Sequence, residues 1–262
     1  MRKLLLLLFV IFLLGCSKVP VSGRKQLNLL PESELMTMSL TEYQSFLKQN
    51  KTVASGNANA HMVKTVGQKI AVAAESYLKK HAQLGRVKDF NWEFNLVDDP
   101  TVNAWCMPGG KVVFYTGILP ITKDENGLAV VMGHEIAHAI ARHGNERMSQ
   151  GLLLQAGGIG LQLAMHDKPA LTQNLLLQSY GVSSQLGTLK FSRMHESEAD
   201  RMGLIFMAMA GYNPEASIPF WQRMSEAGGQ KPPEFLSTHP HDDTRISDLK
   251  QWMPEALKYY KS

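Results

Sequence analysis

The segment His134-Glu135-Ile136-Ala137-His138 limits most strongly what this chain can become, because it places three ionisable side chains inside an apolar stretch. Histidines four residues apart lie about 40° from each other on an α-helix, so both imidazoles can reach one metal ion. Glu135 lies beside them, within reach of a water molecule at an open metal position. A chain of this composition would contain the pattern by chance about 0.02 times. We therefore expect a buried helix that binds zinc through His134 and His138, with Glu135 as the general base.

A catalytic zinc site has three protein ligands and one open position, so a further ligand is needed. Gly144 stands six residues after His138, where one class of zinc proteases has its third histidine. His143 lies about 180° round the helix from His134 and should face away from the metal. We expect His143 to support the site or to pack, and not to bind the zinc.

The third ligand is predicted on a second helix, in the segment 195–200, which reads His-Glu-Ser-Glu-Ala-Asp. Glu196 and Asp200 are four residues apart and share one helix face. We expect Glu196 to bind zinc and Asp200 to accept a hydrogen bond from the free ring nitrogen of a zinc-bound histidine. Ala199 and Gly203 share this face and permit close approach of the two helices.

Four motifs together resemble the gluzincin metallopeptidases and, within them, peptidase family M48. They are the segments 133–143 and 196–200, the stretch 103–119 with its Pro-Gly-Gly turn, and Ser237-Thr238-His239-Pro240 with Arg245. The resemblance covers roughly residues 60–250. It implies an α+β fold, a mostly helical gluzincin metalloprotease domain with a small antiparallel sheet whose edge strand lines the active-site cleft. It also implies one zinc ion and hydrolysis of peptide bonds.

The resemblance gives expectations for residues outside the zinc motif. An extended substrate can add a strand to an open sheet edge, and Asn103 and Ala104 begin the candidate edge strand. His239 or Arg245 would stabilise the oxyanion of the tetrahedral intermediate as a catalytic residue. Alternatively, His239 would occupy the open zinc position and displace the water, as the periplasmic branch of the family implies. The sequence does not decide between these roles.

The first 30 residues read as a targeting segment followed by a tether. Two cations, eleven apolar residues and the pair Gly15-Cys16 are typical of a secretory signal and resemble a bacterial lipobox. Eleven apolar residues are too few to cross a bilayer, which takes about 20. We therefore expect a signal peptide over 1–15, a lipid on Cys16 and a polar tether over 16–30, with an uncleaved signal anchor as the alternative. The expected location is the periplasm, lipid-anchored to the outer membrane in a Gram-negative cell.

Residues 31–262 are predicted to form a single zinc metallopeptidase domain, and 44% of the whole chain is hydrophobic, as in ordinary globular proteins. The net charge of +4 falls to +2 without Arg2 and Lys3, which gives no case for a nucleic-acid partner. Cys106 has no histidine placed beside it, so we expect a buried thiol and not a nucleophile. Periodicity predicts helices over 31–48, 61–81, 124–143, 191–210, 214–227 and 244–253, and strands over 90–97, 103–107 and 111–115.

The stretch 151–190 is apolar and rich in glycine and glutamine, and its periodicity assigns it no clear structure. A packed helix pair, a lid over the cleft and a membrane-contacting helix are all compatible with it.

The predicted activity is zinc-dependent endopeptidase cleavage of unfolded or misfolded cell-envelope proteins, a quality-control role implied by the resemblance. Membrane contact through the lipid on Cys16 and a possible adaptor or chaperone protein are the expected partners. Two other classes are alternatives: a scaffold lipoprotein with a structural zinc, and an amidase acting on peptidoglycan. Glu135 argues against a structural zinc, because such a site needs no base.

Overall fold

The computed structural model describes residues 16–167, 170–227, 235, 239 and 244–261, and the predicted signal peptide lies outside them. No helix within these residues is long and apolar enough to cross a bilayer. The elements are β1 (Cys16–Lys18), β2 (Lys25–Leu27), α2 (Glu32–Gln49), α3 (Ala58–Lys80), η1 (Leu84–Arg86), β3 (Glu93–Val97), β4 (Ala104–Met107), β5 (Lys111–Tyr115), η2 (Thr116–Ile118), α4 (Leu119–Thr122), α5 (Glu125–Ala141), α6 (His143–Ala164), α7 (Ala170–Met209), η3 (Pro214–Ala216), α8 (Ser217–Glu226) and α10 (Arg245–Leu257).

Three strands form the central sheet in the order β3-β5-β4. β4 and β5 are antiparallel and make the predicted hairpin, whose turn needs glycine because Gly109 and Gly110 have φ values of 86° and 81°. The sequence predicted an antiparallel sheet; instead β3 pairs in parallel with β5, because the hairpin inserts β5 between β3 and β4. Among the strands that the structure describes, β4 pairs only with β5, as expected for the predicted edge strand.

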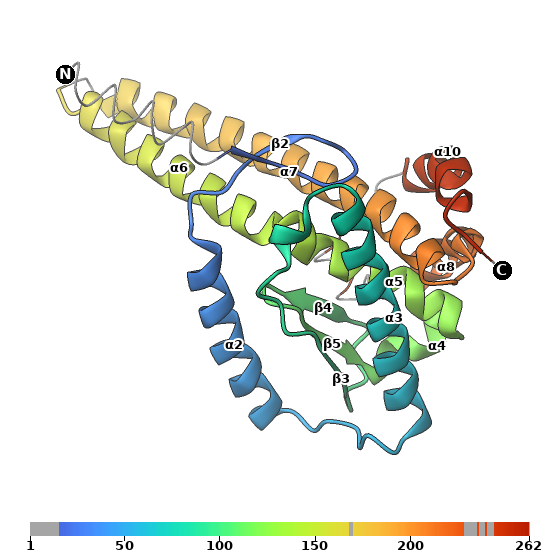
Figure 1. Ribbon diagram of the computed structural model, residues 1–262. Helices are drawn as coiled ribbons and strands as arrows, with labels where there is room; N and C mark the ends of the chain where they lie inside the picture. Colours follow the sequence, from blue (N-terminus) through green and yellow to red (C-terminus); the bar gives the residue numbers. More distant parts are fainter. Residues whose placement is uncertain (1–15, 168–169, 228–234, 236–238, 240–243, 262) are drawn as a thin grey trace.

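Helices cover both faces of this sheet (Figure 1). Side chains alternate along β5, as the pleat of a strand requires. Val113 packs with Tyr43 of α2 on one face, whereas Val112 and Phe114 belong to the main core on the other. That core contains the inner faces of α3, α5 and α7, so the predicted mostly helical α+β fold is confirmed.

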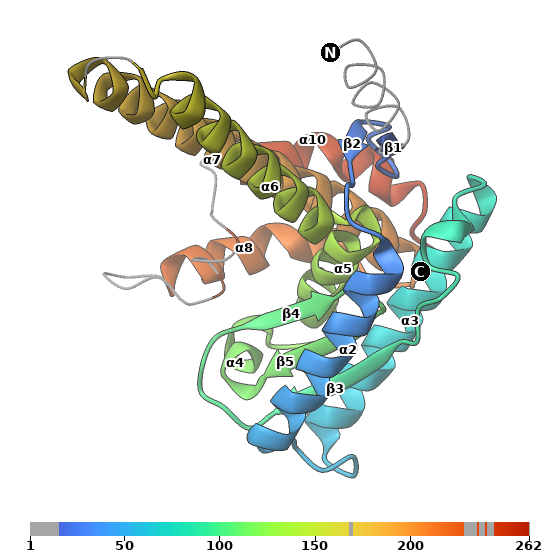
Figure 2. The same cartoon turned by 90° about the vertical axis from the view of Figure 1, so that its left-hand side faces the viewer.

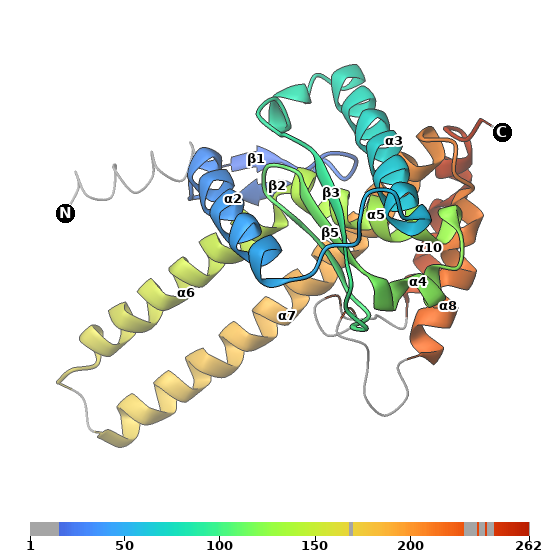
Figure 3. The same cartoon turned by 90° about the horizontal axis from the view of Figure 1, so that it is seen from below.

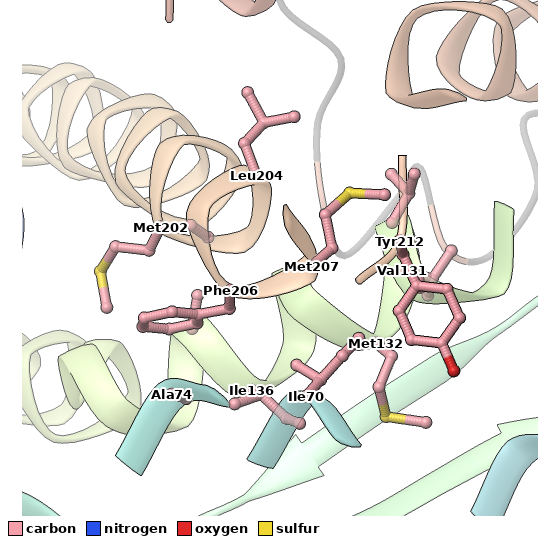
Figure 4. Packing of buried hydrophobic residues seen from close by; sticks show 14 of the residues in the cluster. Ile70, Ala74, Val131, Met132, Ile136, Met202, Leu204, Phe206, Met207 and Tyr212 are labelled. Atoms are coloured by element: carbon pink, nitrogen blue, oxygen red, sulfur yellow. The ribbon is translucent and has the colours of Figure 1, made fainter. Parts of the chain in front are cut away.

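The helix that carries the first motif, α5, lies at the centre of the molecule, and every residue from Gly127 to Ala141 is buried. Asp124 caps its first turn by accepting a hydrogen bond from the Gly127 N–H at 2.9 Å. Figure 4 shows apolar side chains of α5 between those of α3 and α7, among them Ile70, Ala74, Met132, Ile136, Met202 and Phe206.

α5 and α7 meet backbone to backbone at two glycines. A methyl group on Gly203 would lie 2.9 Å from the backbone nitrogen of His134, and one on Gly133 would lie 2.8 Å from the carbonyl oxygen of Gly203. Both distances are shorter than a carbon atom tolerates. The prediction that Gly203 permits close helix approach is therefore confirmed.

The active-site helix ends earlier than predicted. Arg142 has a left-handed backbone with φ of 59°, and a new helix, α6, begins at His143. α6 then runs alongside α7, and the two extend away from the sheet as a long hairpin (Figures 1 and 3). The Tyr180 hydroxyl joins them by donating to the Leu154 carbonyl oxygen at 2.7 Å. Residues 151–164 and 170–190 thus belong to two helices that pack together, the first of the three predicted alternatives.

The segment predicted as a tether over 16–30 is folded onto the body of the protein (Figure 2). β1 and β2 form an antiparallel hairpin, and Val19 between them is fully buried. Gln26 is also buried and donates to the Ala141 carbonyl oxygen at the end of α5. The polar residues that suggested a tether satisfy buried polar groups instead.

Candidate active site

Four buried side chains point their donor atoms at one another: His134 and His138 from α5, Glu196 from α7, and His239. His134 Nε2 lies 3.1 Å from His138 Nε2 and 3.2 Å from Glu196 Oε2. His239 Nδ1 lies 3.1 Å from His134 Nε2 and 3.1 Å from Glu196 Oε2. Two ligands bound at 2.0–2.1 Å to a tetrahedral ion are about 3.3 Å apart. The donor set therefore fits one metal ion, and the three predicted ligands are brought together with a fourth donor.

Asp200 and Arg245 hold this donor set from behind. Asp200 Oδ1 lies 2.8 Å from His134 Nδ1, which leaves His134 Nε2 facing the other donors, as predicted for Asp200. Arg245 donates from Nε to Asp200 at 2.7 Å and from Nη2 to Glu196 at 3.1 Å. Its guanidinium also lies 3.9 Å above the ring of Trp221. Arg245 therefore supports the two carboxylates of the site, and its predicted oxyanion role stays a prediction.

His239 reaches both the donor set and Glu135. While its Nδ1 faces His134 and Glu196, its Nε2 lies 3.3 Å from Glu135 Oε1. The ring stacks on Phe235 with centroids 4.7 Å apart. His239 therefore lies within reach of both the three predicted ligands and the predicted base, and its two predicted roles stay predictions.

Burial and charge set the protonation of the donor set. Burial lowers the pKa of His138 well below its usual value, which keeps the imidazole neutral, as a metal ligand must be. Burial opposes ionisation of Glu196, but the surrounding imidazoles outweigh it and hold the pKa well below the usual range. Burial also opposes the charge on His134, yet hydrogen bonds to Asp200 and Glu196 raise its pKa to about 10. A metal ion at this point therefore replaces a proton.

Glu135 lies on α5 and Cys106 on β4, two elements that pack against each other. Burial raises the pKa of Glu135 above its usual value, which suits a carboxylate that must accept a proton. Burial and then the charge of Glu135 raise the pKa of the Cys106 thiol. A raised thiol pKa is the opposite of what a nucleophilic cysteine needs. It fits the prediction of a packing thiol.

The predicted substrate-binding residues Asn103 and Ala104 stand at the start of the edge strand β4, and their backbone groups point in opposite directions. The Asn103 carbonyl oxygen accepts from the Tyr115 N–H at 3.1 Å, so Asn103 faces the neighbouring strand. In an antiparallel pair such residues alternate with residues whose backbone groups point the other way. Ala104 and Cys106 therefore face the open edge, although the Ala104 N–H is bonded to the Asn103 side chain at 2.9 Å. The sequence analysis did not identify the backbone of Cys106 as facing the open edge, because only the register of β4 against β5 reveals its direction.

His143 contacts the site despite the prediction that it faces away from the metal. The break at Arg142 turns the chain, so that His143 Nδ1 lies 2.9 Å from His138 Nδ1. The angle of about 180° assumed one continuous helix. The supporting role proposed for His143 thus fits, but for a reason that a periodic pattern does not contain.

Comparison with known proteins gives the family. The model of peptidase family M48 matches residues 55–253. The mitochondrial metalloendopeptidase OMA1 of Saccharomyces cerevisiae is 30% identical over 99% of this chain and 76% of its own length. The protein of the same name from Schizosaccharomyces pombe is 38% identical over 68% of this chain and 52% of its own. The β-barrel assembly-enhancing protease of Yersinia pestis is 32% identical over 61% of this chain and 34% of its own.

The predicted periplasmic, lipid-anchored location is wrong by this comparison, because the relatives that match most of this chain are named as mitochondrial proteins. The chain spans about half the length of the relatives from fission yeast and human. The family match itself covers most of the chain and includes both the active-site helix and the Glu196 helix. The chain belongs to peptidase family M48.

Proposed function

We propose that this protein is a zinc-dependent endopeptidase that cleaves unfolded or misfolded protein chains, with Glu135 as its general base. The observation that carries the proposal is the set of three donors, His134, His138 and Glu196, at the spacing of one tetrahedral ion. Glu135 lies on the same helix, buried and with a raised pKa. Two imidazoles and one carboxylate are a donor set that suits catalytic zinc.

The residues around this set have separate tasks in the proposed reaction. When bound, zinc polarises the scissile carbonyl and makes water a nucleophile at neutral pH. Glu135 takes the proton of that water and returns it to the leaving amine. Asp200 fixes the tautomer of His134, and Arg245 fixes Asp200 and Glu196.

The open edge of β4 supports a polypeptide substrate. The outward backbone groups of Cys106 and the carbonyl oxygen of Ala104 can pair with an extended chain, and β4 packs against α5, the helix that carries Glu135. Recognition through backbone groups does not depend on side-chain sequence. It therefore suits segments of varied sequence that are already unfolded.

His239 is proposed to keep the enzyme at rest. Its Nδ1 lies where a zinc-bound water would complete the ligand sphere, and its Nε2 lies beside Glu135. In that position it would exclude the water from the metal and contact the carboxylate of Glu135, the proposed base. Entry of a substrate strand would have to displace it.

The test compares Glu135→Gln with wild type, using zinc content and cleavage of unfolded casein. We expect both proteins to bind about one zinc and only wild type to cleave. Glu42→Gln, an exposed residue of α2, is the matched control and should behave as wild type. Cleavage by Glu135→Gln at the wild-type rate would contradict the role of Glu135. Release of peptides from isolated peptidoglycan, without casein cleavage, would favour an amidase instead.

A further inference from the structure

A buried relay leads from the metal site to the N-terminal hairpin. His138 presents Nε2 to the donor set, so its Nδ1 carries the proton and can donate to His143 Nδ1, 2.9 Å away. The other ring nitrogen of His143 then carries a proton and faces Glu198 Oε2 at 3.2 Å. The pattern is a ligand histidine, a second histidine and a carboxylate, with one consistent set of tautomers.

Arg24 fixes the carboxylate at the end of this relay. It donates from Nε and Nη2 to the two oxygens of Glu198, both at 2.9 Å. It also donates from Nη1 and Nη2 to the two oxygens of Glu146, both at 2.7 Å. Ser22 adds a hydroxyl bond to Glu198 at 2.5 Å. Every one of these contacts with Glu198 comes from the turn between β1 and β2.

One guanidinium thus compensates two buried carboxylates. Glu146 and Glu198 have side chains only 3% and 7% exposed, and two such charges repel each other in a medium that screens poorly. Without Arg24, the Glu198 carboxylate would lose the two hydrogen bonds that hold it toward His143. His143 would then lose a fixed acceptor, and the orientation of His138 would loosen.

The hairpin is anchored well enough to act as a support. Val19 is fully buried, and Gln26 donates to the Ala141 carbonyl oxygen at 2.5 Å, at the end of the helix that carries His138. Arg24 stands between these two anchors. Its position is therefore fixed relative to α5.

We propose that Arg24 is a positioning residue of the metal site, which acts on His138 through Glu198 and His143. It touches neither metal nor substrate. The proposal rests on the proposed function only in that the donor set binds zinc. Loss of Arg24 should weaken zinc binding by more than its effect on the stability of the metal-free protein explains.

The experiment measures the zinc dissociation constant of the full chain by chelator competition, and the unfolding temperature of the metal-free protein. We expect Arg24→Gln to weaken zinc binding about 10- to 100-fold. Lys25→Gln, an exposed cation on the same hairpin, should leave it unchanged. Arg24→Lys keeps the charge but lacks the planar set of N–H donors of a guanidinium, so it should bind zinc more tightly than Arg24→Gln and more weakly than wild type. In a His143→Leu background, Arg24→Gln should add little, because the relay is already cut.

Unchanged zinc affinity in Arg24→Gln, with a lower unfolding temperature of the metal-free protein, would overturn the proposal and leave Arg24 a purely structural residue. If Arg24→Gln fails to fold, Ser22→Ala gives the decision, since Ser22 is exposed and bonds to the same carboxylate. A several-fold loss of affinity in Ser22→Ala supports the relay, and no loss overturns it. Zinc binding that depends on Arg24 without any casein cleavage would uphold the relay and reject the protease; cleavage with no such dependence would do the reverse.

Discussion

At the scale of single residues, His239 gives the sharpest prediction, because it both completes the donor set and contacts Glu135. His239→Ala should keep its zinc, since three protein ligands suffice for a catalytic site. It should cleave casein faster than wild type, because the position of the water is freed. Initial rates with equal zinc loading check this. Slower cleavage with unchanged zinc content would instead give His239 the oxyanion role.

The sequence predicted the donor set in two steps, because a spacing of four residues puts His134 and His138 on one face of a helix and Glu196 and Asp200 on one face of another. The supports of the ligands were not equally visible. Asp200 shares a helix with Glu196 and was found. The approach of His143 depends on one left-handed residue, Arg142, which no periodicity announces.

At the scale of elements, the crossing of α5 and α7 decides whether Glu196 reaches the histidines. Gly203→Ala places a methyl 2.9 Å from the backbone nitrogen of His134. Neither backbone can yield easily, so we expect a loss of about 1–3 kcal/mol in unfolding free energy, and weaker zinc binding. Urea unfolding and chelator competition measure the two effects.

The matched control for this substitution is Gly151→Ala. Gly151 lies within α6 and has open space around the added methyl group. Alanine there should stabilise the protein by roughly 0.5–1 kcal/mol, since helical glycine costs backbone entropy. The same sign of effect at both positions would contradict the close crossing.

The sequence predicted the strands of the sheet but not which strands pair with each other. The hairpin of β4 and β5 followed from the Pro-Gly-Gly turn, and its edge position agreed with the expectation. The parallel pairing of β3 with β5 did not follow, because alternation along a strand indicates burial and not its neighbour. The outward direction of the Cys106 backbone depends on the register of β4 against β5, which alternation does not give either.

At the scale of the whole molecule, Glu146 links acid stability to the attachment of the N-terminal hairpin. Burial opposes its ionisation, but hydrogen bonds from Arg24 and His195 outweigh burial and lower its pKa from 4.5 to about 2. A lowered carboxyl pKa stabilises the fold fully above pH 4.5, and the contribution is lost as the pH falls towards 2. Between these pH values the free energy of unfolding of the wild type should fall by about 1–3 kcal/mol more than that of Glu146→Gln.

Urea unfolding across this pH range measures the difference, with a chelator present so that metal release does not contribute. The exposed Glu42 provides the control as Glu42→Gln, which should follow the wild-type curve. Parallel curves for wild type and Glu146→Gln would show that this carboxylate does not govern the acid transition.

The position of Arg24 in the chain has a consequence for where the working unit begins. The match to the family model starts at residue 55, whereas the guanidinium that joins Glu146 and Glu198 lies upstream of that boundary. A fragment that begins at residue 55 keeps the predicted metal ligands. It loses the Arg24 guanidinium, which orders the relay from His138 through His143 to Glu198. A boundary drawn from the family model alone therefore excludes a residue that the zinc site needs.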